Sequence, residues 1–415
     1  MQNYTPSQND KNILRELAKE YMQIASLPIQ QETAALYRGI NGLKPTRPIV
    51  LIDELPWHQL NFDGSLTLMC ENAFARGIEE FMRKTLFKWR NCRADMYVDP
   101  FIPIYKPIKY TGNGVDFLDT ELSQGDGNNI VAHEYTDQFE TDESIEKLHN
   151  VTITYDSEAA MAMMDAAQEI FDGIAPVKLV GVNAYISVWD DIARYRGVTP
   201  LLMDLAMRPE FMHELVSKLM DIELDKIRQF EEQNLYEPHP ALTHCTAAFT
   251  DALPQSDFDP YHVRAKDVWG RGMAQIFAHV SRDMHDEFDI QYIKKVLGKF
   301  GQVYYGCCEP LHHKIDLVEK IDNLRKISIT PWADVDIAAE CIGSKYVLAS
   351  KPNPAFVAGT FDADVVKNEI THVLDACKRN NTTCEFVLKD ISSVGNRPQN
   401  LFEWEKCAME TVLGY

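Results

Sequence analysis

The pattern of apolar and polar positions divides the chain into a helical beginning and a long alternation of strands and helices. Residues 10–40 carry apolar side chains at helical spacing, and the helix they predict should end before Pro28. A second amphipathic helix is expected over residues 70–90, and a short strand or extended segment over residues 48–57. We therefore predict a helical extension or cap over residues 1–92.

From residue 93 onward, short β-branched or aromatic runs alternate with helical stretches. Strands are expected at residues 94–100, 128–135, 177–185, 241–248, 302–308, 326–330, 345–350 and 384–391. Helices are expected between them, at residues 157–172, 198–232, 270–298, 310–322, 333–342 and 364–379. Such alternation indicates parallel strands joined by crossover helices, and eight strands favour a closed barrel over an open sheet. The predicted fold class is therefore α/β: a (β/α)8 TIM barrel over residues 93–415, with the N-terminal helical extension.

Composition and charge act mainly by excluding classes of protein. The chain has 415 residues, of which 45% are hydrophobic and 25% charged, as in an ordinary soluble globular protein. Its formal net charge of −21 argues against a nucleic-acid partner. No apolar run approaches the roughly 18 residues of a membrane span, and the N-terminus lacks the pattern of a signal peptide. Nine cysteines, an odd number, indicate reduced thiols rather than a disulfide framework, so a cytoplasmic location is expected.

The strand ends select the candidate functional residues, because in a TIM barrel the loops after the strands build the active site. The last four strands stop in the compact polar clusters "GCCEP", "TPWAD", "SKPNP" and "LKD", which predict a common mouth. Structural alternatives stay open for several of these residues. Asp334 could cap the next helix, Asn353 could shape a turn, and Lys389 could form an ion pair with Asp390.

The segment "QVYYGCCEPLHH", from Gln302 to His313, joins two adjacent cysteines, a glutamate and two histidines to the end of one strand. Thiolate, carboxylate and imidazole groups are the ligands that zinc prefers. Metal ligation by at least one of the two cysteines is therefore one interpretation. A redox disulfide between Cys307 and Cys308 is disfavoured, because adjacent cysteines close a strained ring. The two histidines are expected to begin the following helix.

Four segments carry a resemblance to a known family: "RGVTPLLMDLAMRPEFMHELVSKLMD" (196–221), "GMAQIFAHVSRDMHDEFDIQYIKKVL" (272–297), "SKPNPA" (350–355) and "RPQNLFEW" (397–404). By these segments, from about residue 180 to its end, the chain resembles the uroporphyrinogen decarboxylase superfamily of TIM barrels. That superfamily includes corrinoid-dependent methyltransferases. The resemblance covers more than half of the chain and is carried by the set rather than by one motif.

Two departures from the family pattern refine this resemblance. The decarboxylases carry an arginine-rich N-terminal signature that binds carboxylates, whereas here the early arginines are scattered and "DEL" at 53–55 is acidic. The methyltransferases hold zinc with a strand-end His-x-Cys and a later Cys. Here Tyr305 stands in place of the His, Cys307 matches the first Cys, and Lys389 or Asp390 replaces the later Cys. This harder, more acidic site suits a methyl ether, whose departing oxygen needs a Lewis acid or a general acid.

The leading hypothesis is accordingly a first methyltransferase of the O-demethylase type. It moves a methyl group from a small O-methylated substrate, expected to be an aromatic methyl ether, to the cobalt of a corrinoid-binding partner protein. The resemblance implies zinc as a second cofactor beside that corrinoid. The alternatives are a decarboxylase or lyase acting on a small carboxylated substrate, and a non-catalytic binding protein. The sequence also leaves a homodimer open.

Each candidate residue receives a role under this hypothesis. Catalytic roles are expected for Glu309, Asp390, Lys389 and Asp334. Substrate binding is expected of Tyr185, Trp189, His244, Trp332, Lys351 and Asn353, where the aromatic residues would stack on a ring. The expected metal ligands are Cys307, Cys308, Glu309 and Asp390.

Overall fold

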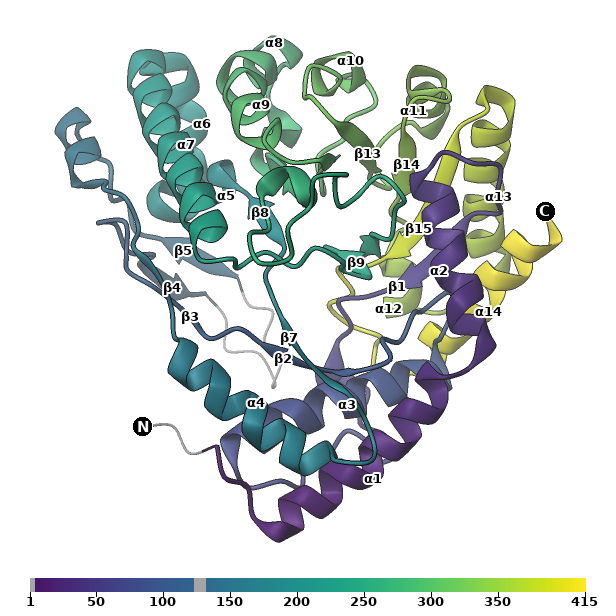
Figure 1. Ribbon diagram of the computed structural model, residues 1–415. Helices are drawn as coiled ribbons and strands as arrows, with labels where there is room; N and C mark the ends of the chain where they lie inside the picture. The colour runs from purple at the N-terminus through teal and green to yellow at the C-terminus, as the bar shows by residue number, and fades with distance from the viewer. Residues whose placement is uncertain (1–3, 123–131) are drawn as a thin grey trace.

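A parallel β-sheet with alternating helices forms the centre of the molecule. The computed structural model describes residues 4–122 and 132–415 (Figure 1). Within these residues, seven strands pair in parallel in the order β1-β15-β14-β13-β12-β11-β8. Their bounds are β1 Ile49–Ile52, β8 Ala184–Ile186, β11 Trp269–Gly272, β12 Gln302–Tyr305, β13 Leu324–Ile329, β14 Val347–Ser350 and β15 Thr383–Leu388. The molecule is thus an α/β protein, in agreement with the predicted alternation.

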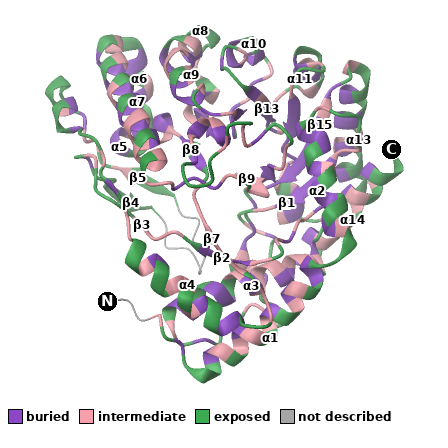
Figure 2. Ribbon diagram, viewed as in Figure 1, coloured by how far each residue is buried: buried purple, intermediate pink, exposed green. Residues whose placement is uncertain are grey.

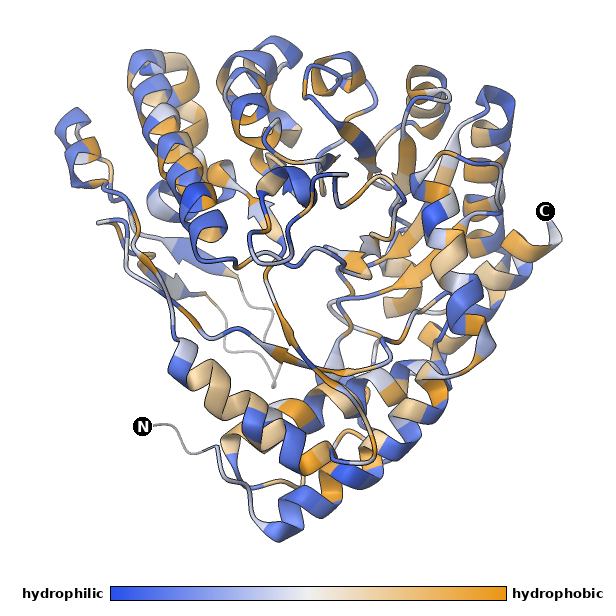
Figure 3. Ribbon diagram, in the orientation of Figure 1, coloured by the Kyte–Doolittle hydropathy of each residue, from blue (hydrophilic) through white to orange (hydrophobic). Residues whose placement is uncertain are grey.

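Helices stand in a row along the outer side of these strands (Figure 1). Their bounds are α5 Val188–Arg196, α6 Val198–Met207, α7 Pro209–Glu232, α8 Arg282–His285, α9 Gln291–Leu297, α10 Ile315–Val318, α11 Val335–Ile342, α12 Ala355–Ala358, α13 Ala363–Asn380 and α14 Gln399–Gly414. Helix α13 illustrates why they form. Asp362 caps its first turn by accepting from two backbone N–H groups, and Val366, Ile370 and Val373 form a buried stripe at helical spacing. The buried and apolar residues concentrate on the strands and on the inner faces of the helices (Figures 2 and 3).

The N-terminal helices form a separate layer with its own core (Figure 1). Its helices are α1 Gln8–Ala25 and α3 Ala73–Asn91, and α4 Ser157–Phe171 packs against α1. Helix α2 Pro28–Asn41 instead packs against β1 and β15 of the main sheet. Leu14, Ala18 and Tyr21 lie on one face of α1 and are fully buried or nearly so. The expected break before Pro28 is present. The strand expected within residues 48–57 is also present, but it joins the main sheet beside β15 instead of staying with the helices.

Smaller elements fill the remaining segments. Strands β2 Ile102–Tyr105 and β7 Val177–Val180 pair in parallel, whereas three pairs are antiparallel: β3 Ile108–Tyr110 with β6 Ile153–Tyr155, β4 Asp119–Glu121 with β5 His133–Tyr135, and β9 Leu242–Thr243 with β10 Thr246–Ala247. Short 3-10 helices cover Trp57–Gln59, Asp142–Lys147, Ala265–Asp267 and Gln275–His279, and Asp286–Ile290 is a π-helical turn. No helix in the described ranges combines the length and apolar character that crossing a membrane requires.

The predicted strands need three corrections. Residues 94–100 form no strand, and β2 begins only at Ile102. The single strand expected over 177–185 is divided into β7 and β8, which belong to different sheets. Residues 241–248 form the antiparallel β9–β10 hairpin instead of one parallel strand. Part of the strand expected over 128–135 lies outside the described residues.

Strand β11 was missed, because residues 270–298 were predicted as helix. The two glycines of "WGRG" weaken the sequence signal for a strand. In the structure they allow a close approach: a Cβ on Gly270 would lie 2.4 Å from the ring of Phe300, and one on Gly272 would lie 2.6 Å from Leu297. A side chain at either position would collide with Phe300 or Leu297, so glycine is required where α9 and the residues directly after it pack against β11.

Strands β8 and β1 are the two edges of the seven-stranded sheet. No strand pairing joins these edges in the part of the chain that the structure describes, so closure into an eight-stranded barrel stays a prediction. The β9–β10 hairpin lies on the inner side of the sheet. Its residues Cys245 and Ala247 share a buried cluster with Leu51, Val347 and Val387 from three strands.

Candidate functional site

The residues that follow β1, β12 and β15 meet the turn of the β9–β10 hairpin. Parallel strands end at the same edge of a sheet, so side chains after them can share one mouth. Lys389 is the centre of the group: its Nζ lies 3.1 Å from His244 Nε2, 3.4 Å from Cys307 Sγ, 3.3 Å from Glu54 Oε2 and 3.2 Å from Asp390 Oδ2. We call the group the mouth cluster; its members are Glu54, His244, Cys245, Cys307, Cys308, Lys389 and Asp390.

Backbone strain marks the mouth cluster. Glu54, His244, Cys245 and Asp390 have φ values of 50°, 40°, 68° and 56°, in the left-handed region that disfavours residues with a side chain. His244 and Cys245 form the two-residue hairpin turn, where both central residues have positive φ and the usual sequence is Asn-Gly. Strain of this kind persists only where the surrounding structure enforces it, and it concentrates at functional sites. It therefore supports a functional role for this group.

The two adjacent cysteines of the cluster differ in the acidity of their thiols. Cys307 is 5% exposed, and its Sγ lies 3.7 Å from Cys308 Sγ and 3.9 Å from His244 Nε2. The hydrogen bond from Cys308 lowers the pKa of Cys307 most. Burial opposes it, but the positive charges of Lys389 and Arg271 add to the lowering. The pKa of Cys308 is raised by its hydrogen bond to Cys307 and by burial.

Lys389 stays a cation and His244 stays neutral around neutral pH. Burial by itself would lower the pKa of Lys389, but the negative charges of Cys307, Asp390 and Glu54 outweigh burial and raise it. Burial lowers the pKa of His244, and the positive charges of Arg271 and Lys389 add to this. A neutral imidazole can accept through Nε2, so the ammonium of Lys389 donates to that nitrogen.

One group of three potential metal ligands occurs within the described ranges. A carboxylate oxygen of Glu54, a ring nitrogen of His244 and the sulfur of Cys245 lie within 4.8 Å of one another. Oxygen, nitrogen and sulfur donors suit zinc. Burial raises the pKa of the Cys245 thiol, so a metal would have to displace its proton. The donor chemistry fits zinc, and these three residues would hold it.

The predicted metal ligands are not brought together as one set. Cys308 Sγ and Asp390 Oδ2 are 3.7 Å apart, so residues 307–308 and 389–390 do converge as expected. Glu309 does not join them: it is fully buried, and its two oxygens accept from the backbone N–H groups of Ala274, at 3.1 Å, and Cys307, at 2.9 Å. Burial raises the pKa of Glu309 to about 7. Its position suits fixing the ends of β11 and β12 better than facing a substrate.

The aromatic and lysine candidates divide between the mouth, the core and the surface. Tyr185 lies at the mouth, 41% exposed, with its ring 5.5 Å from the ring of His244. Lys351 is buried, with Nζ 5.5 Å from the centre of the Tyr304 ring. Trp189 is fully buried against Phe277 and is a core residue. Trp332 is 68% exposed and is a surface residue.

The structural alternatives that the sequence had left open are present: Lys389 forms the ion pair with Asp390 at 3.2 Å, and Asp334 and Asn353 have local structural roles. Asp334 is the N-cap of α11, and its side chain accepts from the backbone N–H of Ile337 at 3.1 Å. Asn353 shapes the turn after β14, since its Oδ1 accepts from the backbone N–H of Ala355 at 3.0 Å. Neither contact reaches the mouth cluster.

Sequence reasoning missed Glu54 and Arg271. Glu54 follows the apolar run "IVLI" at a strand end, so the rule that selected the other candidates would have found it had this strand been assigned to the sheet. Arg271 was hidden within the predicted helix at 270–298. In the structure its guanidinium carbon lies 4.6 Å from the centre of the Tyr185 ring.

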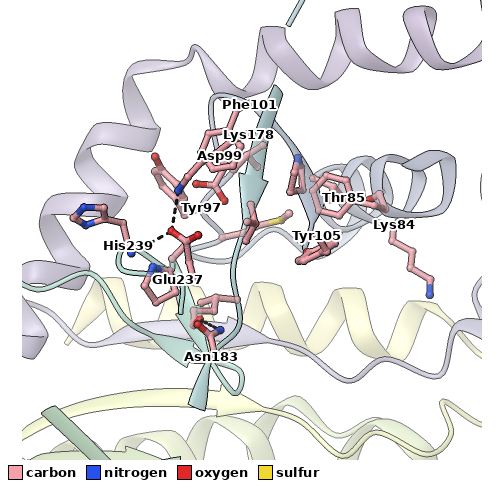
Figure 4. A pocket seen from close by; sticks show the side chains of 18 of the residues that line it. Lys84, Thr85, Tyr97, Asp99, Phe101, Tyr105, Lys178, Asn183, Glu237 and His239 are labelled. Atoms are coloured by element: carbon pink, nitrogen blue, oxygen red, sulfur yellow. Dashed lines mark hydrogen bonds and ion pairs between the residues drawn. The ribbon is translucent and has the colours of Figure 1, made fainter. Parts of the chain in front are cut away.

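A cavity of about 450 Å³ lies beside the mouth, between the N-terminal helices and β7. Tyr97, Phe101 and Tyr105 line it, together with Lys178, which forms an ion pair with Glu237 at 2.8 Å (Figure 4). Burial raises the pKa of Asp99, another lining residue, to about 6. The cavity shares its wall with the mouth segments, because Asp53 precedes Glu54 and Leu242 belongs to the hairpin. It offers apolar walls for a small molecule near the cluster.

The comparisons with known proteins identify a fold. No family model matches the chain, and no curated protein matches its sequence. Among solved structures, a methyltransferase from Methanosarcina mazei is similar, with a TM-score of 0.50 over 92% of this chain and 98% of that chain. The two sequences are 9% identical, so the similarity establishes a shared fold and no more.

Proposed function

We propose that the chain is a methyltransferase that moves a methyl group from a small O-methylated substrate, an aromatic methyl ether, to the cobalt of a corrinoid protein. The observation that carries this proposal is the buried ammonium of Lys389, held among Cys307, His244 and Glu54 at the carboxyl ends of the strands. The fold shared with the Methanosarcina mazei methyltransferase supports the same class of reaction.

The chemistry demands positive charge at the departing oxygen. As the bond between the methyl carbon and the ether oxygen breaks, the electron pair stays on that oxygen and the methyl group passes to the acceptor. A fixed hydrogen-bond donor in a dry site stabilises such a developing oxyanion far better than water does. The raised pKa of Lys389 keeps its proton in place, so we assign it electrostatic stabilisation rather than proton donation. Tyr185, half-exposed at the mouth, would pack on an aromatic substrate.

Zinc would be held by Glu54, His244 and Cys245. When bound, it would supply a Lewis acid for the departing oxygen. His244 Nε2 accepts from Lys389, so a metal bound through this nitrogen would displace the lysine contact. Glu54→Gln and His244→Gln should therefore each remove zinc binding, whereas Lys389→Met should retain or strengthen it. Elemental analysis and zinc titration of the purified proteins measure this, and equal zinc contents in all variants would exclude the site.

An anaerobic assay tests the proposed activity. The protein is mixed with reduced cobalamin and a panel of methoxylated aromatics, and formation of methylcobalamin is followed spectrophotometrically. We expect at least one donor to react. If none reacts and the folded protein binds none of them, the proposal fails. Release of CO₂ from a carboxylated substrate without any need for cobalt would instead favour the decarboxylase alternative.

A further inference from the structure

Two buried cations lie inside the sheet near the mouth cluster without an anionic hydrogen-bond partner. Arg271 is 1% and Lys351 6% exposed. Neither side chain forms an ion pair in the described part of the chain; Lys351 Nζ, Arg271 Nε and Arg271 Nη1 also lack any hydrogen-bond partner there. The hydroxyl of Tyr304, between them, is equally unpartnered. Three side chains with buried donor groups thus lie in one region, and the protein itself supplies no hydrogen-bond acceptor for these donors in the described residues.

The strand register explains why these groups share one side. Gly270 and Gly272 face outward, since their missing Cβ atoms would meet Phe300 and Leu297, so Arg271 between them faces inward. In the sheet, Arg271 stands directly beside Tyr304 of β12. Its guanidinium carbon lies 5.4 Å from the centre of the Tyr304 ring, and Lys351 Nζ lies 5.5 Å from the same centre.

Lys326, a buried lysine in the same interior, has the partners that a structural charge requires. It is fully buried, but its Nζ lies 2.9 Å from Glu385 and also donates to the hydroxyl of Thr246 and the carbonyl of Ala247. A buried charge left without such partners destabilises a protein strongly. The negative charge of Cys307 acts on Arg271, but no hydrogen bond joins the two side chains. Arg271 donates to the carbonyl of Gly306 at 3.4 Å and also interacts with the hydroxyl of Tyr185, and both of these partners are uncharged. The fold therefore leaves positive charge available for a ligand.

We infer that Arg271, Lys351 and Tyr304 form a binding site for an anionic group, a carboxylate or a phosphate, carried by the substrate. A planar guanidinium matches either group through two parallel hydrogen bonds, and the ammonium and the phenol add further donors. Tyr185, beside Arg271 and partly exposed, provides the route from solvent. The identity of the methyl donor rests on the proposed function: the anionic group would then belong to an O-methylated aromatic acid or a phosphorylated methyl ether.

Binding of simple anions tests the site without cobalt or a methyl group. Isothermal titration at low salt compares benzoate, inorganic phosphate and the neutral isostere benzamide. We expect one anion to bind at least tenfold more tightly than benzamide; benzoate marks a carboxylate site and phosphate a phosphate site. Arg271→Gln and Lys351→Met should each weaken that binding at least tenfold, and the exposed-lysine control Lys345→Met should not. Absence of anion binding, or binding unaffected by both substitutions, overturns the inference.

Thermal unfolding separates a ligand site from a structural role. Because Lys351 is buried without a partner, Lys351→Met should raise the melting temperature of the ligand-free protein while it weakens anion binding. Lys326→Met, the matched control, should lower the melting temperature, because it leaves Glu385 unpaired. A lower melting temperature for Lys351→Met would mark that lysine as structural and overturn its assignment. Benzoate binding without methyl transfer would refute the proposed function alone.

Discussion

Replacing Lys389 by Met should raise the pKa of the Cys307 thiol. The two groups are 3.4 Å apart, and both are at least nine-tenths buried. At an effective dielectric constant of about 20, two unit charges at this distance attract each other by about 5 kcal/mol. If water entering the variant screens half of that, more than 2 kcal/mol remains, enough to change the ratio of thiolate to thiol more than tenfold.

A difference titration measures this effect. The ultraviolet absorbance of thiolates is followed against pH for the parent and for Cys307→Ser, and the difference between the two isolates Cys307 among the nine cysteines. The same pair of titrations is then repeated in the Lys389→Met background. In the parent, the Cys307 step should lie well below the usual range of a cysteine, and without Lys389 it should move to higher pH. Lys345→Met, at a surface lysine, is the matched control.

The sign of the stability change follows from the same coupling. Because the pKa of Cys307 is lowered in the folded protein, its thiolate stabilises the fold above the ordinary cysteine pKa. That stability is lost as the pH falls through the lower, folded value. An unmoved Cys307 step in Lys389→Met would refute the reasoning. The hydrogen bond from Cys308 would then be the main cause of the lowered pKa.

Three further predictions concern stability and are checked by urea unfolding. Lys326→Met should lower the free energy of unfolding by about 3–5 kcal/mol, since it breaks a fully buried ion pair; no loss would mean that Glu385 finds another partner. Gly270→Ala should lower it by about 1–3 kcal/mol, because the new Cβ meets Phe300, whereas Gly77→Ala in α3, with open space around it, should raise it by about 0.5–1 kcal/mol. Burial raises the pKa of Glu369 to about 7, so between about pH 4.5 and about pH 7 the folded protein holds a proton that the unfolded chain releases. The stability that comes from this bound proton is present below about pH 4.5 and should be lost as the pH rises to about 7. Glu369→Gln, which keeps the acceptor for the backbone of Asn353, should flatten that dependence, and an unchanged slope would contradict the assignment.

The strand-end rule found much of the site from sequence, because strands with clear β-rich patterns mark their own ends. Strands β12 to β15 lie close to where they were expected, and so Cys307, Cys308, Lys389 and Asp390 were located as neighbours. The rule says which edge a residue occupies but not where its side chain points. Glu309 shows the difference, since the backbone takes both of its oxygens.

The remaining features depend on tertiary contacts that leave no local signal. The turn at His244 and Cys245 lacks the Asn or Gly that announces a two-residue hairpin, so its conformation is imposed by the packing around it. Strand β11 is held by its neighbours despite two glycines. Among the described residues, Lys351 Nζ has no hydrogen-bond partner, whereas Lys326 pairs with Glu385, and this difference depends on which strands face each other across the interior.

The most direct test of the central claim is the rate at which a methoxylated aromatic donor methylates reduced cobalamin under anaerobic conditions, with the parent and with Lys389→Met. Removing a donor that stabilises a developing oxyanion costs about 100-fold to 1000-fold in rate. We expect the parent to form methylcobalamin and Lys389→Met to be slower by at least 100-fold at unchanged donor binding. A variant that retains the parent rate would show that the mouth cluster is not where the methyl group is transferred.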